Sequence, residues 1–323
     1  MDEVRIPNRA TYWPTAPVDM LLAAPLAARI LLGASPVGRL VQAAAMTAYL
    51  GSAFQDWRAR QGIRRIGFLR EFGADLHNLT LMPDPARREE IRLLTQRVND
   101  QYTAERIPRR ELAVEVDRHL TRYIAGITGQ RVESSTEVRN FSVVHLVFPF
   151  ALGACDPLSG DIAIFKDTGV FEPHVIAHEF CHRKGYWKEM EAQVLAFMSN
   201  ATSGVPVLVQ SALCERLHRN LRALAGDSAE RFRELVAQSG LRRELSENFL
   251  ALQPPDGAKP GAVELAMRKL YDERMRLTGQ NGISDYDVGF TNFLYTFELS
   301  DRARQSPPPA GVVHKRPPRA LKP

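Results

Sequence analysis

The sequence contains one H-E-x-x-H pattern, His178-Glu179-Phe180-Cys181-His182. On an α-helix, positions 178 and 182 lie about one turn apart, so both imidazoles project from the same face and can bind one Zn²⁺. Glu179 projects roughly 100° further round the helix, where it can reach a water molecule beside the metal. Zn²⁺ lowers the pKa of that water, and Glu179 takes its proton and later passes it to the leaving group. The pattern therefore predicts a zinc hydrolase with Glu179 as the general base.

The segments around this motif predict two helices joined by a tight turn. Pro173 suits the first position of a helix, because its φ is already fixed and no N–H is needed there. Gly185 follows His182 by three residues and predicts the end of the first helix. A second helical run begins near Trp187. A carboxylate at the start of this second helix could complete a three-ligand zinc site.

Two acidic residues compete for the role of third ligand. Glu189 shares its helix face with small or polar side chains, which would let the second helix pack closely against the first. Glu191 shares its face with bulky apolar residues that are typical of a core, Val194, Leu195 and Met198. We therefore expect Glu189 to bind the metal and Glu191 to hold a ligand imidazole in place. The alternative is that both are solvated acids that complement the helix dipole.

Two further residues could take part in the chemistry. His174 lies one turn before His178, where it could touch the metal or stabilise the transition state. Tyr286 opens a predicted helix after Gly282 and could reach the cleft as a donor to the developing oxyanion. Simple packing is the competing interpretation for each of them.

The stretch His178-Glu179-Phe180-Cys181-His182-Arg183-Lys184-Gly185-Tyr186, followed by Glu189-Met190-Glu191-Ala192-Gln193, resembles the signature of a bacterial zinc peptidase family. Its members are predicted to be membrane-associated and gluzincin-like. Their signature reads H-E, a hydrophobic residue, a small residue, H, two variable residues and G, and then E-x-E-A-N. The resemblance implies a gluzincin fold, bound Zn²⁺ and Glu189 as the third ligand. Softer similarity extends it to residues 137–298, and the chain departs from the family in having Gln193 in place of Asn.

The sequence predicts an α+β fold that is mostly helical, and the resemblance implies a zincin-like domain with a small β-sheet before the H-E-x-x-H helix. Strands are expected at 141–148 and 161–165, where β-branched and aromatic residues are enriched. Gly160–Phe165 could be an edge strand that pairs with the substrate backbone, or an ordinary inner strand. Apolar periodicity predicts further helices at 86–103, 109–127, 206–225, 229–239, 243–252, 262–277 and 286–298.

We expect three regions along the chain: an N-terminal helical hairpin at 1–82, the catalytic domain at 83–300, and a disordered, basic, proline-rich tail at 301–323. Residues 20–54 are rich in Ala and Leu, but Pro and Arg interrupt them, which favours a packed hairpin over a membrane span. Attachment to a membrane surface through residues 20–54 is the alternative. The arginines that follow would then keep the catalytic part on the cytoplasmic side.

Cysteine content and charge exclude several classes of protein. Cys155, Cys181 and Cys214 show no C-x-x-C spacing, so neither a disulfide framework nor a Cys-rich zinc site is expected. A cytoplasmic setting fits best, with the inner face of the cytoplasmic membrane as the alternative. The tail holds six Lys and Arg residues against Asp301, and its net of +5 equals the formal net charge of the whole chain. The rest of the chain is therefore near neutral, and no nucleic-acid partner is expected.

Three function classes are consistent with these patterns. The first is a zinc-dependent metallopeptidase that acts on a peptide or protein substrate. The second is a non-catalytic module that keeps the zinc fold to sense or bind a partner. The third is a di-iron helical protein, in which Glu179 with His182 and Glu215 with His218 would each supply an E-x-x-H pair. Because Glu215 and His218 lie opposite the apolar face of their predicted helix, we expect them to meet solvent, which disfavours the third class.

Overall fold

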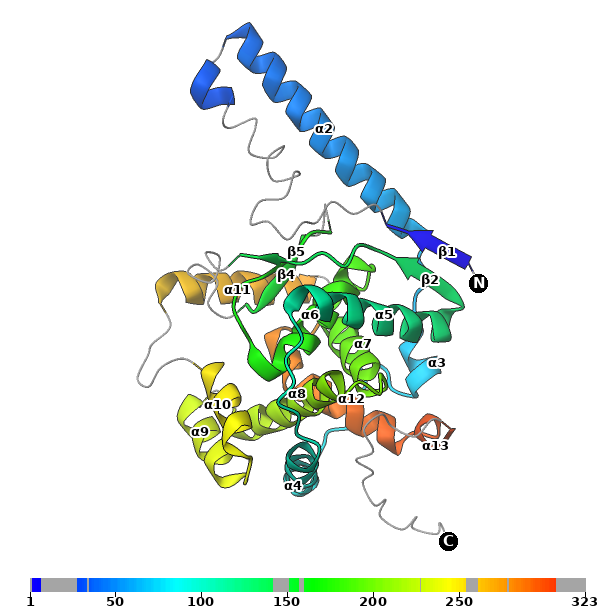
Figure 1. The fold of residues 1–323 in the computed structure, drawn as a ribbon, viewed down its shortest axis with the longest axis vertical. Coiled ribbons are helices and arrows are strands. Elements are labelled where there is room, and N and C mark those ends of the chain that lie inside the picture. The colour runs from blue at the N-terminus through cyan, green and yellow to red at the C-terminus, as the bar shows by residue number, and fades with distance from the viewer. Residues whose placement is uncertain are drawn as a thin grey trace. The chain divides into compact units, whose positions relative to one another are not determined.

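The structure is a computed structural model that describes residues 2–6, 28–33, 35–141, 151–156, 160–226, 228–253, 261–277 and 279–305. These residues are mostly helical and carry small β-sheets (Figure 1), which confirms the predicted α+β class. Most of the predicted strand at 141–148 lies outside the described residues, as does the predicted disordered tail beyond residue 305.

The chain divides into two compact units. Unit 1 comprises Met1–Arg65, Ile107–Asp167 and Glu179–Trp187. Unit 2 comprises Ile66–Arg106, Thr168–His178 and Lys188–Pro323. Each unit therefore takes segments from several parts of the sequence, and the unit limits differ from the domain limits expected at residues 82 and 300.

Unit 2 is a helical assembly around α8 (Pro206–Ala225), which packs against α4 (Asp84–Asp100), α7 (Glu189–Ala201), α9 (Ala229–Gln238) and α12 (Val288–Leu299). The same unit contains α3 (Phe68–Phe72), α10 (Arg243–Ala251), α11 (Ala262–Leu277), α13 (Arg302–Gln305) and the 3-10 turns η2 (Gly169–Phe171) and η3 (Ile283–Tyr286). The predicted bounds of α8 and α11 are confirmed. These helices were predictable from the sequence, since apolar periodicity runs along each of them and a proline or glycine lies near both ends.

Helix α8 is buried on its polar side as well as on its apolar side. Leu213, Leu217 and Leu221 repeat at helical spacing and join one core with α4, α9 and α10. On another side, Arg216 is 1% exposed and lies 2.7 Å from the carboxylate of Glu298 on α12. A second ion pair joins Arg216 to α4. Charged residues of α8 are therefore held inside unit 2 by partners on neighbouring helices.

Unit 1 contains two small sheets within its described residues. β1 (Asp2–Arg5) pairs in parallel with β2 (Gln130–Glu133). In the second sheet, β5 (Ile162–Ile164) lies between β3 (Arg139–Asn140), which is parallel to it, and β4 (Gly153–Cys155), which is antiparallel. The unit's main helices are α5 (Arg109–Thr128), which was predicted within one residue, and α2 (Pro36–Gln61).

The inner position of β5 decides between two alternatives. Gly160–Phe165 was considered either as an edge strand for the substrate backbone or as an ordinary inner strand, and β5 pairs with a neighbour on each side. Ile162 and Ile164 are buried, as expected of an inner strand. Within the described part of this sheet, the outer strands are β3 and β4.

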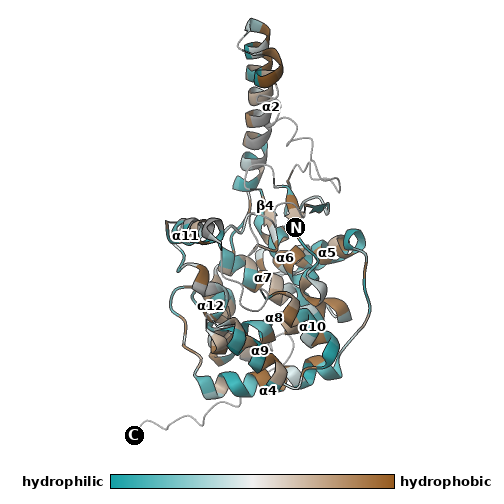
Figure 2. Ribbon diagram, turned by 90° about the vertical axis from the view of Figure 1, so that its left-hand side faces the viewer, coloured by the Kyte–Doolittle hydropathy of each residue, from teal (hydrophilic) through white to brown (hydrophobic). Residues whose placement is uncertain are grey.

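Helix α2 contains the second arm of the predicted N-terminal hairpin. Ser35 caps its N-terminus, since the Ser35 hydroxyl oxygen accepts a hydrogen bond from Gly38 N at 3.1 Å. Most of the first arm lies outside the described residues. Figure 2 shows hydrophobic and hydrophilic residues mixed along α2. No helix among the described residues combines the length and the apolar character needed to cross a membrane.

Candidate metal centre

Helix α6 (Glu172–Arg183) carries the H-E-x-x-H residues without a break. It ends in a Schellman motif, in which Tyr186 N donates to the Cys181 carbonyl oxygen at 2.9 Å. Gly185 N donates to the His182 carbonyl oxygen, also at 2.9 Å. Gly185 has a φ of +94°, which residues with a side chain rarely adopt. The helix end predicted at Gly185 is therefore confirmed.

Two cations with no exposed surface, Arg183 and Lys184, fix the end of α6. Lys184 Nζ lies 2.8 Å from the carboxylate of Asp117 on α5. The Arg183 guanidinium donates at 2.6–3.1 Å to three backbone carbonyl oxygens, which belong to Ser135, Glu137 and Gly160. These contacts hold the last turn of α6, and with it the backbone position of His182.

The three predicted ligands come together. Glu189 is the first residue of α7, and the ligand atoms of His178, His182 and Glu189 all lie within 4.8 Å of one another. His178 Nε2 is 3.0 Å from Glu189 Oε2. Two ligand atoms on one tetrahedral Zn²⁺ are about 3.3 Å apart when the bonds are about 2.0–2.1 Å long. Two imidazoles and one carboxylate at this spacing fit a zinc ion. Glu191, in the first turn of α7, is not part of this group.

The backbone selects the tautomer of His182. Its Nδ1 lies 2.8 Å from the carbonyl oxygen of Tyr186. A carbonyl oxygen can only accept a hydrogen bond, so Nδ1 carries the proton and Nε2 carries the lone pair that a metal requires. The His182 ring also stacks on Trp187, with centroids 5.9 Å apart and planes inclined by 7°. The turn that ends α6 therefore orients the His182 ring in the way that a metal ligand requires.

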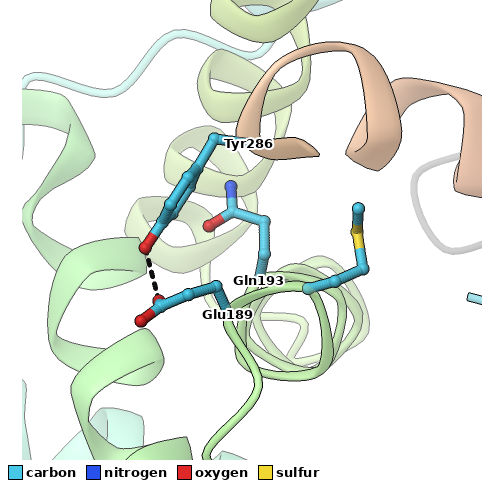
Figure 3. A pocket seen from close by; sticks show the side chains of 4 residues that line it. Glu189, Gln193 and Tyr286 are labelled. Atoms are coloured by element: carbon cyan, nitrogen blue, oxygen red, sulfur yellow. Dashed lines mark hydrogen bonds between the residues drawn. The ribbon is translucent and has the colours of Figure 1, made fainter. Parts of the chain in front are cut away.

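Two tyrosine hydroxyls hold the Glu189 carboxylate. Tyr271 donates to Oε1 and Tyr286 donates to Oε2, and the second of these bonds is drawn in Figure 3. The two hydroxyl oxygens lie 3.4 Å apart. Burial and the adjacent Glu189 carboxylate raise the pKa of Tyr286 well above its usual value, so this phenol remains a hydrogen-bond donor. The backbone of Glu189 is also fixed, since its N–H donates to Gln280 Oε1 at 2.7 Å.

Sequence reasoning missed Tyr271. This residue lies on α11, 82 positions after Glu189, and a single tyrosine in an amphipathic helix carries no local sign of such a contact. Tyr286 was considered as a possible oxyanion donor, with packing as the competing interpretation. Its hydroxyl donates to a carboxylate oxygen of Glu189, the predicted third ligand.

His174 is not among the grouped ligand atoms. It is 3% exposed, and its Nε2 lies 3.8 Å from Glu215 Oε1. Burial lowers the pKa of His174 to about 4, so the ring is neutral near pH 7. Gln193 Nε2 donates to the same Glu215 oxygen at 2.6 Å. These three residues form a buried polar layer in unit 2.

The expectation that Glu215 and His218 meet solvent was wrong, because they are 4% and 8% exposed. Burial alone would raise the pKa of Glu215, but Arg219 and His174 hold that pKa below its usual range. The ring of His218 lies 5.2–5.7 Å from three aromatic rings, those of Phe171, Phe232 and Phe249. The physical reason is that neighbouring helices cover α8 on its polar side too. In the part of the chain that the structure describes, His178, His182 and Glu189 form the one group suited to a metal, so the di-iron hypothesis gains no support.

Glu179 lies beside strand β4. It is 6% exposed, and a Cβ added to Gly153 would lie 3.3 Å from Glu179 Cγ. The same Cβ would lie 3.1 Å from the Ala163 carbonyl oxygen on β5. The glycine at position 153 thus lets β4 approach both β5 and the predicted general base.

A family model described as "Protein of unknown function (DUF3810)" matches residues 151–295. This stretch runs from β4 into α12 and contains every residue of the metal centre described above. No curated protein and no solved structure matches the chain.

Proposed function

We propose that the chain is a zinc-dependent, zincin-like metallopeptidase that hydrolyses peptide bonds. The observation that carries this proposal is the grouping of the ligand atoms of His178, His182 and Glu189 within 4.8 Å. When bound, Zn²⁺ would polarise the scissile carbonyl and lower the pKa of the attacking water.

The chain's own residues then have distinct roles. Glu179 follows a ligand directly in the H-E-x-x-H helix and is the general base that takes a proton from water and delivers it to the leaving amine. Tyr271 and Tyr286 hold the Glu189 carboxylate by hydrogen bonds to its two oxygens. The Tyr186 carbonyl keeps His182 in the tautomer that a metal needs. We place the enzyme in the cytoplasm, with residues 20–54 as the segment that would attach it to the inner face of the membrane.

Metal content tests the ligand set. Elemental analysis of the purified chain should find about one zinc per chain, and His182→Ala and Glu189→Ala should lose it. Glu191→Ala, on the same helix, should keep zinc because Glu191 is outside the grouped ligand atoms. Zinc lost with Glu191→Ala and retained with Glu189→Ala would move the third ligand to position 191. Two irons per chain would replace the zinc hypothesis.

Turnover tests the reaction. Glu179→Gln should keep its zinc and lose hydrolysis of a fluorogenic peptide library by about 100-fold or more, because general-base catalysis contributes that much. A Glu179→Gln gene that fully replaces the wild-type gene in a deletion strain would favour the non-catalytic binding module instead.

A further inference from the structure

Unit 1 contains a pocket of about 390 Å³ at the C-terminal end of α2. Its lining combines aromatic and cationic side chains with one amide and one aliphatic group: Trp57, Arg60, Gln61, Ile63, Arg65 and Trp187. Two of the chain's three tryptophans therefore line this single pocket. The volume falls within the roughly 300–1,000 Å³ that is usual for small-ligand sites.

The charge of the lining is one-sided, with two guanidinium groups and no carboxylate. Arg60 is 6% exposed, and its Nε donates to the Arg183 carbonyl oxygen at 3.2 Å. Its Nη2 is buried and donates no hydrogen bond within the described residues. A Cβ on Gly160 would clash with this nitrogen, so the guanidinium is confined on that side. The Arg60 guanidinium is thus held in place by one hydrogen bond, and its Nη2 has no acceptor among the described residues, which favours an anion as a further partner.

The pocket adjoins the metal centre through Trp187. The Trp187 ring lines the pocket and stacks on the imidazole of His182 at 5.9 Å. The Arg60 guanidinium carbon lies 5.8 Å from the centre of the same Trp187 ring. One aromatic ring therefore separates a metal-ligand imidazole from a cationic binding site. The second cation of the pocket, Arg65, donates a hydrogen bond to the carbonyl oxygen of Gly185, which lies in the turn between His182 and Trp187.

We propose that this pocket receives a carboxylate of the peptide substrate, either an acidic side chain or a free C-terminus. The planar guanidinium fork matches a planar carboxylate, and the tryptophan walls accept the flat faces of that group. The assignment of the carboxylate to a substrate rests on the proposed peptidase function. The carboxylate site itself rests on the residues that line this pocket in unit 1.

Binding without turnover tests the site. Tryptophan fluorescence of the Glu179→Gln chain would be titrated with two pairs of peptides. The first pair differs by Glu against Gln at one internal position, and the second by a C-terminal carboxylate against an amide. In one pair the carboxylate member should bind about tenfold tighter or more, because a hydrogen bond to a charged group contributes that much. The pair that shows the difference identifies the source of the carboxylate. Equal affinities in both pairs would overturn the proposal.

Exposed residues supply variants that should still fold. Arg65→Gln and Trp57→Ala should remove most of the preference for the carboxylate. Arg58→Gln is the matched control, since Arg58 is exposed on α2 and does not line the pocket. A preference that survives in Arg65→Gln would also overturn the proposal.

The outcomes separate this proposal from the peptidase proposal. If the protein holds no zinc and cleaves no peptide but still prefers carboxylates through Arg65, the carboxylate site stands and the peptidase function fails. If zinc and turnover are found but no preference for a carboxylate appears in binding, the carboxylate site fails and the peptidase function stands.

Discussion

The hydroxyl of Tyr286 donates a hydrogen bond to Glu189 Oε2, the oxygen that lies 3.0 Å from His178 Nε2. Tyr271 donates to the other oxygen of the same carboxylate. The carboxylate expected to bind zinc is thus oriented by two phenols that follow it in the sequence by 82 and 97 residues. Such partners of a ligand set its orientation and basicity, so their removal should weaken metal binding while leaving the ligands in place.

Replacing either phenol tests this relationship. Tyr271→Phe and Tyr286→Phe should each weaken zinc binding by about 10- to 100-fold, as is usual when a hydrogen-bond partner of a ligand is lost. Competition with a chromophoric chelator measures the affinity. Tyr102→Phe is the control, because the Tyr102 ring packs against Arg242 rather than against the metal centre. Unchanged affinity in both variants would show that the phenols do not support Glu189.

Gly153→Ala should reduce peptide hydrolysis without removing zinc. The new Cβ would lie 3.0–3.3 Å from Ile164 Cδ1, the Ala163 carbonyl oxygen and Glu179 Cγ, so Glu179 or β4 must shift. A small displacement of the general base should lower kcat/KM roughly tenfold or more. Gly126→Ala on α5 is the matched control, since its Cβ would meet no atom within 4 Å. Equal activity in the two variants would contradict this account of Gly153.

Lys184→Met should destabilise the fold. The change leaves the Asp117 carboxylate buried without its cation, which costs about 3–5 kcal/mol in the free energy of unfolding. Chemical denaturation measures the loss, and Lys269→Met, at an exposed position of α11, should change stability little. The double variant Lys184→Met/Asp117→Leu should regain part of the loss. A single variant as stable as the wild type would rule out this anchoring role.

Stability should fall in mild acid because of His218. Burial lowers its pKa to about 4 in the folded state, whereas an exposed histidine has a pKa of about 6.5. Between these pH values the unfolded chain binds more protons, so the free energy of unfolding decreases as the pH falls from about 6.5 to about 4. The contribution of this one group is about 3 kcal/mol in total.

His218→Phe should flatten that pH dependence. The new ring replaces an imidazole that already lies among three phenylalanines, and it cannot be protonated. Urea unfolding at pH 7 and pH 4.5 provides the comparison, with the exposed His77→Gln as the control. An unaltered loss of stability in His218→Phe would assign the acid sensitivity to another group, such as His174, whose pKa is also lowered to about 4 by burial.

The sequence predicted correctly the helix ends and residue spacings that depend only on neighbouring residues along the chain. The bounds of α8 follow from Pro206 and the apolar repeat, and the end of α6 follows from Gly185. The pairing of His178 and His182 as candidate ligands was recognisable because helical geometry alone puts them on one face. The choice of Glu189 over Glu191 rested on which helix face carries side chains small enough for close packing, and this is a local property of the sequence.

What the sequence could not predict depends on tertiary partners. The burial of Glu215 and His218 follows from helices that cover the polar side of α8, and no local pattern reveals those helices. The contact of Tyr271 with Glu189 requires α11 to return to the start of α7, which periodicity cannot show. The inner position of β5 depends in the same way on pairing with β3 and β4. In each case the missing information was the identity of a distant neighbour.

The proton on His182 is assigned by a main-chain oxygen in a turn that requires glycine. This part of the proposed metal centre is therefore independent of the side chain at position 186. Evolution can replace the residue at position 186 without changing the tautomer, provided that the turn survives. Position 185 has no such freedom, because its φ of +94° excludes most residues. A search for remote relatives should therefore require the glycine as strictly as the two histidines, and should leave the following aromatic residue open.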